Sequence, residues 1–308
     1  MFAFTLPSWI QALQYIDLVA VGVFVLFGIL VYLIHNYIPK IGAVAWVTAK
    51  EALFQPLFTI LTLVGIFALF IFLLIPYNTL GEDIKLVITQ GLTVVKLIAA
   101  FLAVWTASTT IAEEIDGKTA LMALAKPLNR RDFIIGKYVG VMIAVTLIFL
   151  ILGTFFLNTV SYKVVYDARE SSKDVPTVID CAQVIYDILP GLVLAYLETI
   201  ILAAIAIAVS TRLPLLPNLT ITLIIYLLGN IVPVIVQSSI GQLPMVVFVA
   251  NFVSVFLPCL DHFSMETAVA MGKTVSWIYV LWAVSYASWY CLAALIVSLL
   301  LFKNRDLA

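Results

Sequence analysis

The feature that most constrains this chain is a run of residues, 213–260, that contains no charged side chain. A helix that crosses a membrane needs about 20 predominantly apolar residues, so this run is too long for one crossing. Prolines and glycines divide it into a predicted span at 218–236 and a shorter apolar piece at 245–257. The run therefore predicts a protein that folds in a bilayer.

Six further apolar runs predict six more membrane-spanning helices. Of the 308 residues, 64% are hydrophobic and 11% are charged, whereas a soluble domain carries roughly 25% charged residues. The predicted fold is an all-α polytopic membrane protein with about seven transmembrane helices. The six further runs lie at 18–34, 57–75, 97–112, 138–162, 188–211 and 274–302.

Several classes of site are not expected. The three cysteines lie far apart without metal-binding spacing, and Cys259 and Cys291 read as small apolar residues inside apolar runs. His35 and His262 lie at span ends without a nearby cysteine or histidine, so neither predicts a metal site. The net charge of −1 gives no indication of a nucleic-acid partner, and none is expected. The N-terminus lacks the basic region of a cleavable signal peptide, so the first span is expected to be retained.

Lysine and arginine predict the orientation, because short cytoplasmic loops carry an excess of both. With the loop 113–137 on the cytoplasmic side of a cell membrane (inner or plasma membrane), ten basic residues share that side and six lie opposite. The N-terminus is then outside and the C-terminus is cytoplasmic. The cytoplasmic residues are Lys40, Lys50, Lys118, Lys126, Arg130, Arg131, Lys137, Arg212, Lys303 and Arg305, and the outer ones are Lys85, Lys96, Lys163, Arg169, Lys173 and Lys273.

Three further segments complete the predicted topology. An outer loop is expected at 161–186. The segment 240–273 is expected to enter the membrane and return, or to lie on the outer face, because 245–257 is short for a crossing. On the cytoplasmic side, residues 43–55 fit an amphipathic helix along the interface, with Lys50 and Glu51 on one face. The alternative there is a simple extension of the second span.

The segment "AEEIDGKT", residues 112–119, matches a phosphate-loop pattern loosely but is not expected to bind a nucleotide. A phosphate loop presents glycine backbone amides to an anion at a helix N-terminus, after a strand. Here the preceding segment is a membrane span, and Ala112 stands where the first glycine belongs. Glu113, Glu114 and Asp116 also place negative charges where the phosphate would lie.

The same segment predicts a sharp turn followed by a short helix. Gly117 permits the turn, and Pro127 with Asn129 ends the helix. A short helix held along the membrane face fits a groove on a cytoplasmic partner. Its apolar residues recur at helical spacing, at Leu121, Leu124, Ala125 and Leu128.

This loop resembles the one between the second and third core spans in the permease subunits of type-2 ABC exporters. There, an acidic pair, a glycine, a leucine, a proline, an arginine and a lysine follow one another. The end of the chain is similar too, with a long last span followed by "FKNRDL". The likeness covers about residues 40–308, the six-span core, and leaves the extra N-terminal span at 1–39 outside. The matching loop residues are Glu113, Glu114, Gly117, Leu121 or Leu124, Pro127, Arg130 and Lys137.

The resemblance implies a role in ATP-driven export. Two permease halves, identical or different, would face each other above two separate ABC ATPase subunits, which bind ATP and Mg²⁺. This chain would then hold no cofactor and catalyse no reaction itself. The helix at 43–55 and a coupling helix after Gly117 would transmit closure of the ATPases to the spans, as in a two-state element biased by its partner.

The resemblance also implies roles for the charged loop residues. Glu113 and Glu114 would pair with basic groups on the interfacial helix or on the ATPase. Arg130, Arg131 and Lys137 would anchor the loop. Ordinary loop chemistry explains these three basic residues equally well, because basic residues bind lipid headgroups and hold the topology.

Two charged residues lie within or near the spans. Glu198 stands deep in its run, where an acidic side chain such as aspartate costs about 2.5–3.5 kcal/mol on insertion scales. It marks a substrate pathway or a helix-pairing contact, or it is satisfied by Tyr196, Thr199 or a neighbouring helix. Lys96 is expected to extend its amine to the outer face.

Two other functions remain open beside the permease. The chain fits a non-transporting scaffold or assembly factor within a larger membrane complex, and it fits an intramembrane enzyme less well, since Glu198 is the one deeply placed ionisable residue predicted. The sequence does not identify a substrate. The uniformly apolar spans favour a lipid-like or amphipathic cargo over an ion.

Overall fold

The computed structural model of the protein describes residues 8–74, 83–116, 129–170, 176–237, 257–265 and 273–303, with a few single residues between 245 and 269. This described part is helical and contains no β-strand. Its helices are α1 (Ser8–Tyr37), α2 (Pro39–Phe54), α3 (Pro56–Leu74), α4 (Asp83–Asp116), α6 (Arg130–Glu170), α7 (Val178–Ser210), α8 (Leu215–Gln237), the short 3₁₀ helix η2 (Leu260–Phe263) and α11 (Trp277–Lys303).

The helices confirm the predicted fold class. Seven of the described helices, α1, α3, α4, α6, α7, α8 and α11, are long and apolar enough to cross a membrane. Each of them contains most of one apolar run found in the sequence. The protein is therefore an all-α polytopic membrane protein.

Besides α1, which begins ten residues before its apolar run, α4, α6 and α7 extend well beyond theirs. α4 begins at Asp83, α6 continues to Glu170 and α7 begins at Val178. The segment predicted as an outer loop, 161–186, is largely helical, because 161–170 belong to α6 and α7 covers the segment from Val178 onward. Its placement outside the membrane stays a prediction. The prediction treated charged residues as the limits of spans, whereas Lys163 is buried inside the bundle.

The start of α7 has a local cause that the sequence contains. The Asp180 backbone N–H donates to the Thr177 hydroxyl at 3.3 Å, and the Asp180 carboxylate accepts from the Thr177 backbone N–H at 2.9 Å. This reciprocal pair is a capping box, which satisfies backbone donors that the first helical turn leaves without partners. The helix therefore begins well before the apolar run at 188.

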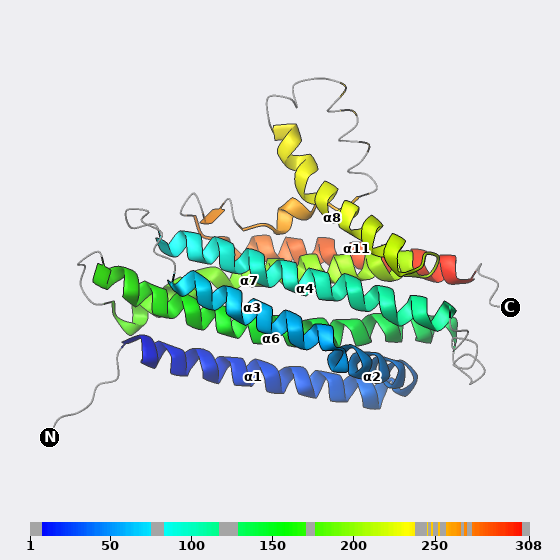
Figure 1. Cartoon of the computed structure of the whole chain (residues 1–308), viewed down its shortest axis with the longest axis horizontal. Helices are drawn as coiled ribbons and strands as arrows, with labels where there is room; N and C mark the ends of the chain where they lie inside the picture. The colour runs from blue at the N-terminus through cyan, green and yellow to red at the C-terminus, as the bar shows by residue number, and fades with distance from the viewer. Residues whose placement is uncertain are drawn as a thin grey trace.

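The core of the bundle joins α4, α6 and α7, with contributions from α3 and α11. α6 contacts α1, α2, α3, α4, α7 and α11, so it is the helix around which the others are arranged. α1 lies on the outside of this bundle, and α8 starts beside α4 and α7 and then tilts away from it (Figure 1). Most of the segment 240–273 lies outside the described residues, so its predicted re-entrant or outer placement stays a prediction.

The basic residues predicted to share one side gather at one end of the bundle. This end, called the α2 end below, consists of α2, the last turn of α4, the first turns of α6 and α8, and the last turn of α11 (Figure 1). α1 begins at one end of the bundle, and α11 ends at the opposite end (Figure 1). The described basic residues at the α2 end are Lys40, Lys50, Arg130, Arg131, Lys137, Arg212 and Lys303.

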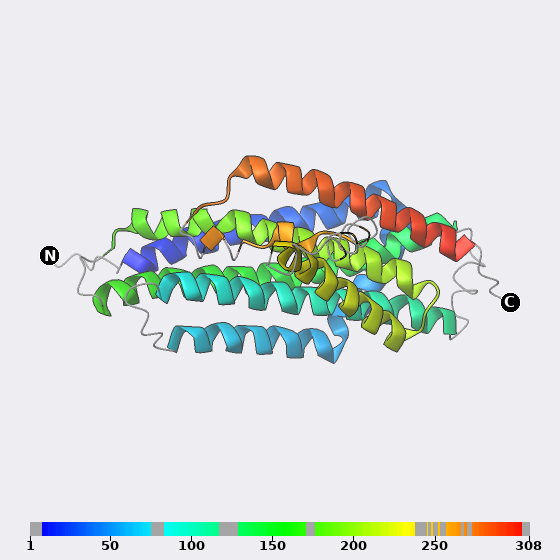
Figure 2. The ribbon, with the colours of Figure 1, turned by 90° about the horizontal axis from the view of Figure 1, so that it is seen from above.

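The helix expected at 43–55 is present as α2 and is separate from the second span. It begins earlier than predicted, with Pro39 in its first turn, a position that proline favours. A second proline, Pro56, starts α3 directly afterwards. α2 runs across the bundle and connects α1 with α3, which lie on different sides of α6 (Figures 1 and 2).

Two glycines allow α2 to lie directly on α6. A Cβ atom at Gly136 would stand 2.7 Å from the Val44 Cβ, and one at Gly140 would stand 2.7 Å from the Ala45 carbonyl oxygen. Backbone atoms cannot move aside as a flexible side chain does, so only glycine fits at 140. The sequence "GKYVG" at 136–140 is the small-xxx-small spacing with which membrane helices approach closely.

We predict that Gly140→Leu destabilises the protein by displacing α2 from α6, at a cost of about 1–3 kcal/mol for an overpacked contact. Thermal unfolding of the detergent-solubilised protein measures the effect. Gly28→Leu on α1 is the matched control, because a Cβ at Gly28 meets nothing within 4 Å. An equal midpoint for both variants would contradict the close contact.

Candidate functional site

The predicted coupling loop is described at both of its ends. Glu113 and Glu114 lie near the end of α4, which closes at Asp116, and their side chains are outside the described residues. Their predicted pairing stays a prediction. The turn and short helix also lie outside the described residues, and with them Gly117, Leu121, Leu124 and Pro127.

Arg130, the first residue of α6, holds the end of the last helix. Its guanidinium donates to the carbonyl oxygens of Phe302 at 3.2 Å and of Lys303 at 2.9 Å. It also lies 5.7 Å from the centre of the Phe302 ring, which stacks on Phe133 of α6. The last carbonyls of a helix lack partners within the helix and carry partial negative charge. Arg130 therefore joins the end of the predicted loop to the C-terminus of α11.

Lys137 connects α6 with α2. Its side chain is 2% exposed, and its amine lies 4.0 Å from the half-exposed Glu51 carboxylate on α2. The same amine lies 5.8 Å from the centre of the Phe133 ring. Of the three basic residues predicted to anchor the loop, Arg130 and Lys137 thus contact different helices, whereas Arg131 is exposed.

Deep in the bundle, Lys96, Glu198 and Asn230 form a polar cluster between α4, α7 and α8. The Lys96 amine lies 3.5 Å from one oxygen of the Glu198 carboxylate, and both side chains are buried. The Asn230 amide donates to the other oxygen at 3.2 Å. The prediction that Lys96 extends to the outer face was wrong, because a buried carboxylate on the facing helix holds its amine in the interior.

The cluster shows which neighbours satisfy Glu198. Tyr196 shares a hydrogen bond with the Thr146 hydroxyl, and the Thr199 hydroxyl donates to the Tyr196 carbonyl. Glu198 contacts the neighbouring helices α4 and α8 through Lys96 and Asn230. Its role in a substrate pathway stays a prediction.

A second buried ion pair was missed by the sequence reasoning. The Lys163 amine of α6 lies 3.7 Å from the Asp83 carboxylate of α4, and both side chains are almost fully buried. The amine also lies 4.8 Å from the centre of the Tyr166 ring. No local pattern identifies the pair, because its members are distant in sequence and each resembles an ordinary charge at a span end.

Asn218 is a further buried polar residue that the sequence did not single out. Its amide donates to the Ser108 hydroxyl at 2.7 Å and to the Ala206 carbonyl at 3.0 Å. The Thr222 hydroxyl donates to its side-chain oxygen at 3.2 Å. Asn218 therefore connects the first turn of α8 to both α4 and α7 at the α2 end.

Comparison with known proteins adds no relative. No protein-family model matches the chain, and no curated protein matches its sequence. Among the described residues, no group of three or more histidine, cysteine, aspartate or glutamate side chains is placed to hold a metal ion. The candidate site therefore rests on the contacts at the α2 end and on the buried polar cluster.

We predict that Arg130→Ala loosens the last turn of α11. Hydrogen bonds from a charged donor contribute about 1.5–3 kcal/mol, and partial exposure here reduces this to on the order of 1 kcal/mol. Hydrogen exchange of the amides in the last two turns of α11 is expected to speed up several-fold. The neighbouring Arg131→Ala is the matched control and leaves these amides unchanged. Equal exchange in both variants would exclude the capping role.

We also predict that Lys96→Met destabilises the protein strongly, because it leaves the buried Glu198 carboxylate without its cation. Breaking a buried ion pair costs about 3–5 kcal/mol. The double variant Lys96→Met/Glu198→Gln is expected to recover most of this loss, since a neutral amide replaces the isolated charge. Denaturant unfolding of four proteins in detergent, namely the wild type, Lys96→Met, Glu198→Gln and the double variant, measures the coupling. Strictly additive losses would show that the two residues do not act as a pair.

Proposed function

We propose that this chain is the membrane-spanning permease subunit of an ABC transporter, and that it exports a substrate with ATP hydrolysed on a separate subunit. The observation that carries the proposal is the arrangement at the α2 end. There, a helix that does not span the membrane lies directly on α6, the helix that follows the predicted coupling loop in the chain.

The contacts at this end suit the transmission of movement. α2 touches the backbone of α6 at Gly140, with no flexible side chain between them. Lys137 adds a contact from α6 to Glu51, and Arg130 ties the same turns of α6 to the end of α11. Packed interiors transmit strain because they deform little. A partner that moves α2 therefore moves α6 and α11 with it.

The chemistry of this end also suits a cytoplasmic partner. Its basic residues outnumber those at the opposite end, as the positive-inside rule expects of a cytoplasmic face. In this proposal the C-terminus is cytoplasmic, the N-terminus is outside, and the chain lies in the cell membrane. The partners are ABC ATPase subunits, which hold ATP and Mg²⁺, a second permease half and membrane lipid.

We predict that the full chain, co-expressed with its neighbouring genes and purified in mild detergent, retains an ATPase subunit with its own phosphate loop. The reason is that a permease of this kind has no nucleotide site and needs that subunit for each cycle. Mass spectrometry of the purified complex identifies the subunit, and phosphate release measures its activity. A stable complex that contains other membrane proteins and no ATPase would favour the scaffold instead.

A loop variant separates docking from coupling within this test. Gly117→Val is expected to retain the ATPase subunit and its hydrolysis but to lose export, since the turn needs a residue with glycine's freedom. Glu114→Ala is expected to act in the same direction. Gly22→Val on α1 is the matched control, because a Cβ at Gly22 meets nothing within 4 Å. Unchanged export in both loop variants would count against a coupling role for this loop.

A further inference from the structure

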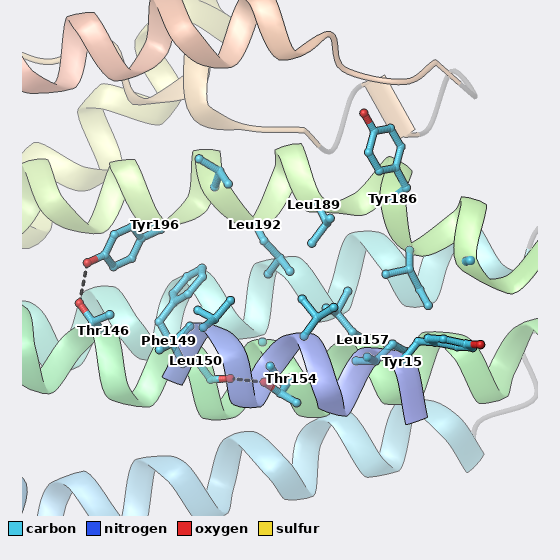
Figure 3. A pocket seen from close by; sticks show the side chains of 18 of the residues that line it. Tyr15, Thr146, Phe149, Leu150, Thr154, Leu157, Tyr186, Leu189, Leu192 and Tyr196 are labelled. Carbon is cyan, nitrogen blue, oxygen red and sulfur yellow. Dashed lines mark hydrogen bonds between the residues drawn. The ribbon is translucent and has the colours of Figure 1, made fainter. Parts of the chain in front are cut away.

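An apolar cavity of about 540 Å³ lies between α1, α6 and α7 (Figure 3). α1 forms its outer wall and otherwise contributes little to the bundle, since the apolar part of this helix is not buried. The volume falls within the roughly 300–1,000 Å³ typical of pockets for small molecules. The cavity lies away from the buried ion pairs and from the α2 end.

The lining of this cavity offers little to a polar ligand. Its walls are aliphatic and aromatic side chains, with the hydroxyls of two threonines among them. The Thr154 hydroxyl donates to the Leu150 carbonyl at 2.7 Å (Figure 3). The Thr146 hydroxyl forms hydrogen bonds with the Met142 carbonyl and with the Tyr196 hydroxyl. A polar group placed here would lose its hydration without gaining a partner. The cavity therefore selects for hydrocarbon.

The two ends of the cavity differ. At the inner end, the Phe149 and Tyr196 rings pack with centres 5.3 Å apart, and Tyr196 bonds to Thr146, so this end is closed. At the other end lie Tyr15 and Tyr186, which are both exposed. The Trp277 indole N–H donates to the Tyr186 hydroxyl at 2.9 Å. Tyrosine and tryptophan gather at membrane interfaces, where one end of the side chain is apolar and the other is wet.

A polar pair marks the same level on the other helices. The Asn158 amide of α6 donates to the Asp17 carboxylate of α1 at 3.3 Å in an exposed position. A charged side chain in an exposed position is costly within hydrocarbon, so this pair lies near the headgroups. The aromatic mouth of the cavity and the polar pair therefore share one interface level.

The depth of the cavity fits one leaflet of a bilayer. Along α6, the lining from Leu157 to Thr146 corresponds to a helical rise of about 15–17 Å, while on α7 it continues past Tyr186 to Val178. Half of a hydrocarbon core about 30 Å thick is also about 15 Å. A helix from a second copy would need a groove along the whole span, with room for a body about 10 Å wide. The closed inner end excludes such an occupant.

We propose that this cavity binds one acyl chain of a bilayer lipid, from the leaflet at the N-terminal end of α1. The chain lies between α6 and α7 under α1, and the headgroup stays at the level of Tyr15 and Tyr186. The site is separate from the proposed coupling between α2 and an ATPase, and it requires no transport by this chain.

The test uses the full chain alone in nanodiscs of phosphatidylcholine that carries a diazirine at the end of one acyl chain. After irradiation, mass spectrometry is expected to find the lipid attached to lining residues of α6 and α7, near Phe149 and Leu192. Gly153→Leu fills the cavity, because a Cβ at Gly153 meets only the Leu192 side chain, at 3.9 Å. This variant is expected to lose the labelling of these helices, whereas the control Gly28→Leu retains it.

A second filling variant, Ala20→Phe, acts from the opposite wall on α1 and is expected to give the same loss. Size-exclusion profiles and unfolding midpoints identify the variants that are folded. Labelling retained in a folded filling variant would overturn the proposal. Labelling spread evenly over the exposed face of α11 would do so as well, as would cross-links to a second copy through α1 in place of lipid.

Discussion

The contact between the backbones of α2 and α6 determines where the first quarter of the chain, α1 to α3, lies. Helices in lipid gain no hydrophobic force from meeting each other, so close packing through small residues carries much of their association. At Gly136 and Gly140, α6 presents bare backbone to α2. Because α2 connects α1 to α3, its place on α6 fixes the starting point of both neighbours. The cavity under α1 depends on the position that this arrangement gives α1 against α6 and α7.

Polar pairs specify the remaining contacts. The ion pair between Lys96 and Glu198 determines which sides of α4 and α7 face each other. Asn230 of α8 donates to the same carboxylate, so α8 packs at this point as well. Nearer the α2 end, Asn218 of α8 makes a second set of polar contacts with α4 and α7. In an apolar medium an unsatisfied polar group costs several kcal/mol. Wrong pairings of these helices are therefore excluded more strongly than aliphatic packing alone would exclude them.

The sequence predicted the number of spans well, because a long apolar run has one stable solution in a bilayer. The run at 18–34 became most of α1, and the separate helix before the second span was also confirmed, since Pro39 and Pro56 delimit it. The ends of α4, α6 and α7 were predicted less well. There, Asp83 and Lys163 looked like charges that leave the membrane, although each neutralises the other.

The sequence also predicted only part of the candidate site. Arg130 and Lys137 were identified from a local pattern, and the structure gives both of them specific contacts. The partners themselves, Phe302 and Glu51, were not predictable, because they come from other parts of the chain. Lys96 was misplaced for the same reason, since its environment depends on a helix that begins far along the sequence. The two glycines of "GKYVG" are a local pattern from which the close packing of α6 could have been predicted.

The two ion pairs of α4 have a mechanical consequence. Asp83 ties this helix to α6, and Lys96 ties it to α7, at points roughly 20 Å apart along its axis. Sliding α4 by one helical turn, about 5.4 Å, would separate both pairs at once and leave their buried charges without partners. The position of α4 along its neighbours is thus fixed, and α4, α6 and α7 form one rigid unit. Any change of shape in this protein must therefore move α4, α6 and α7 together.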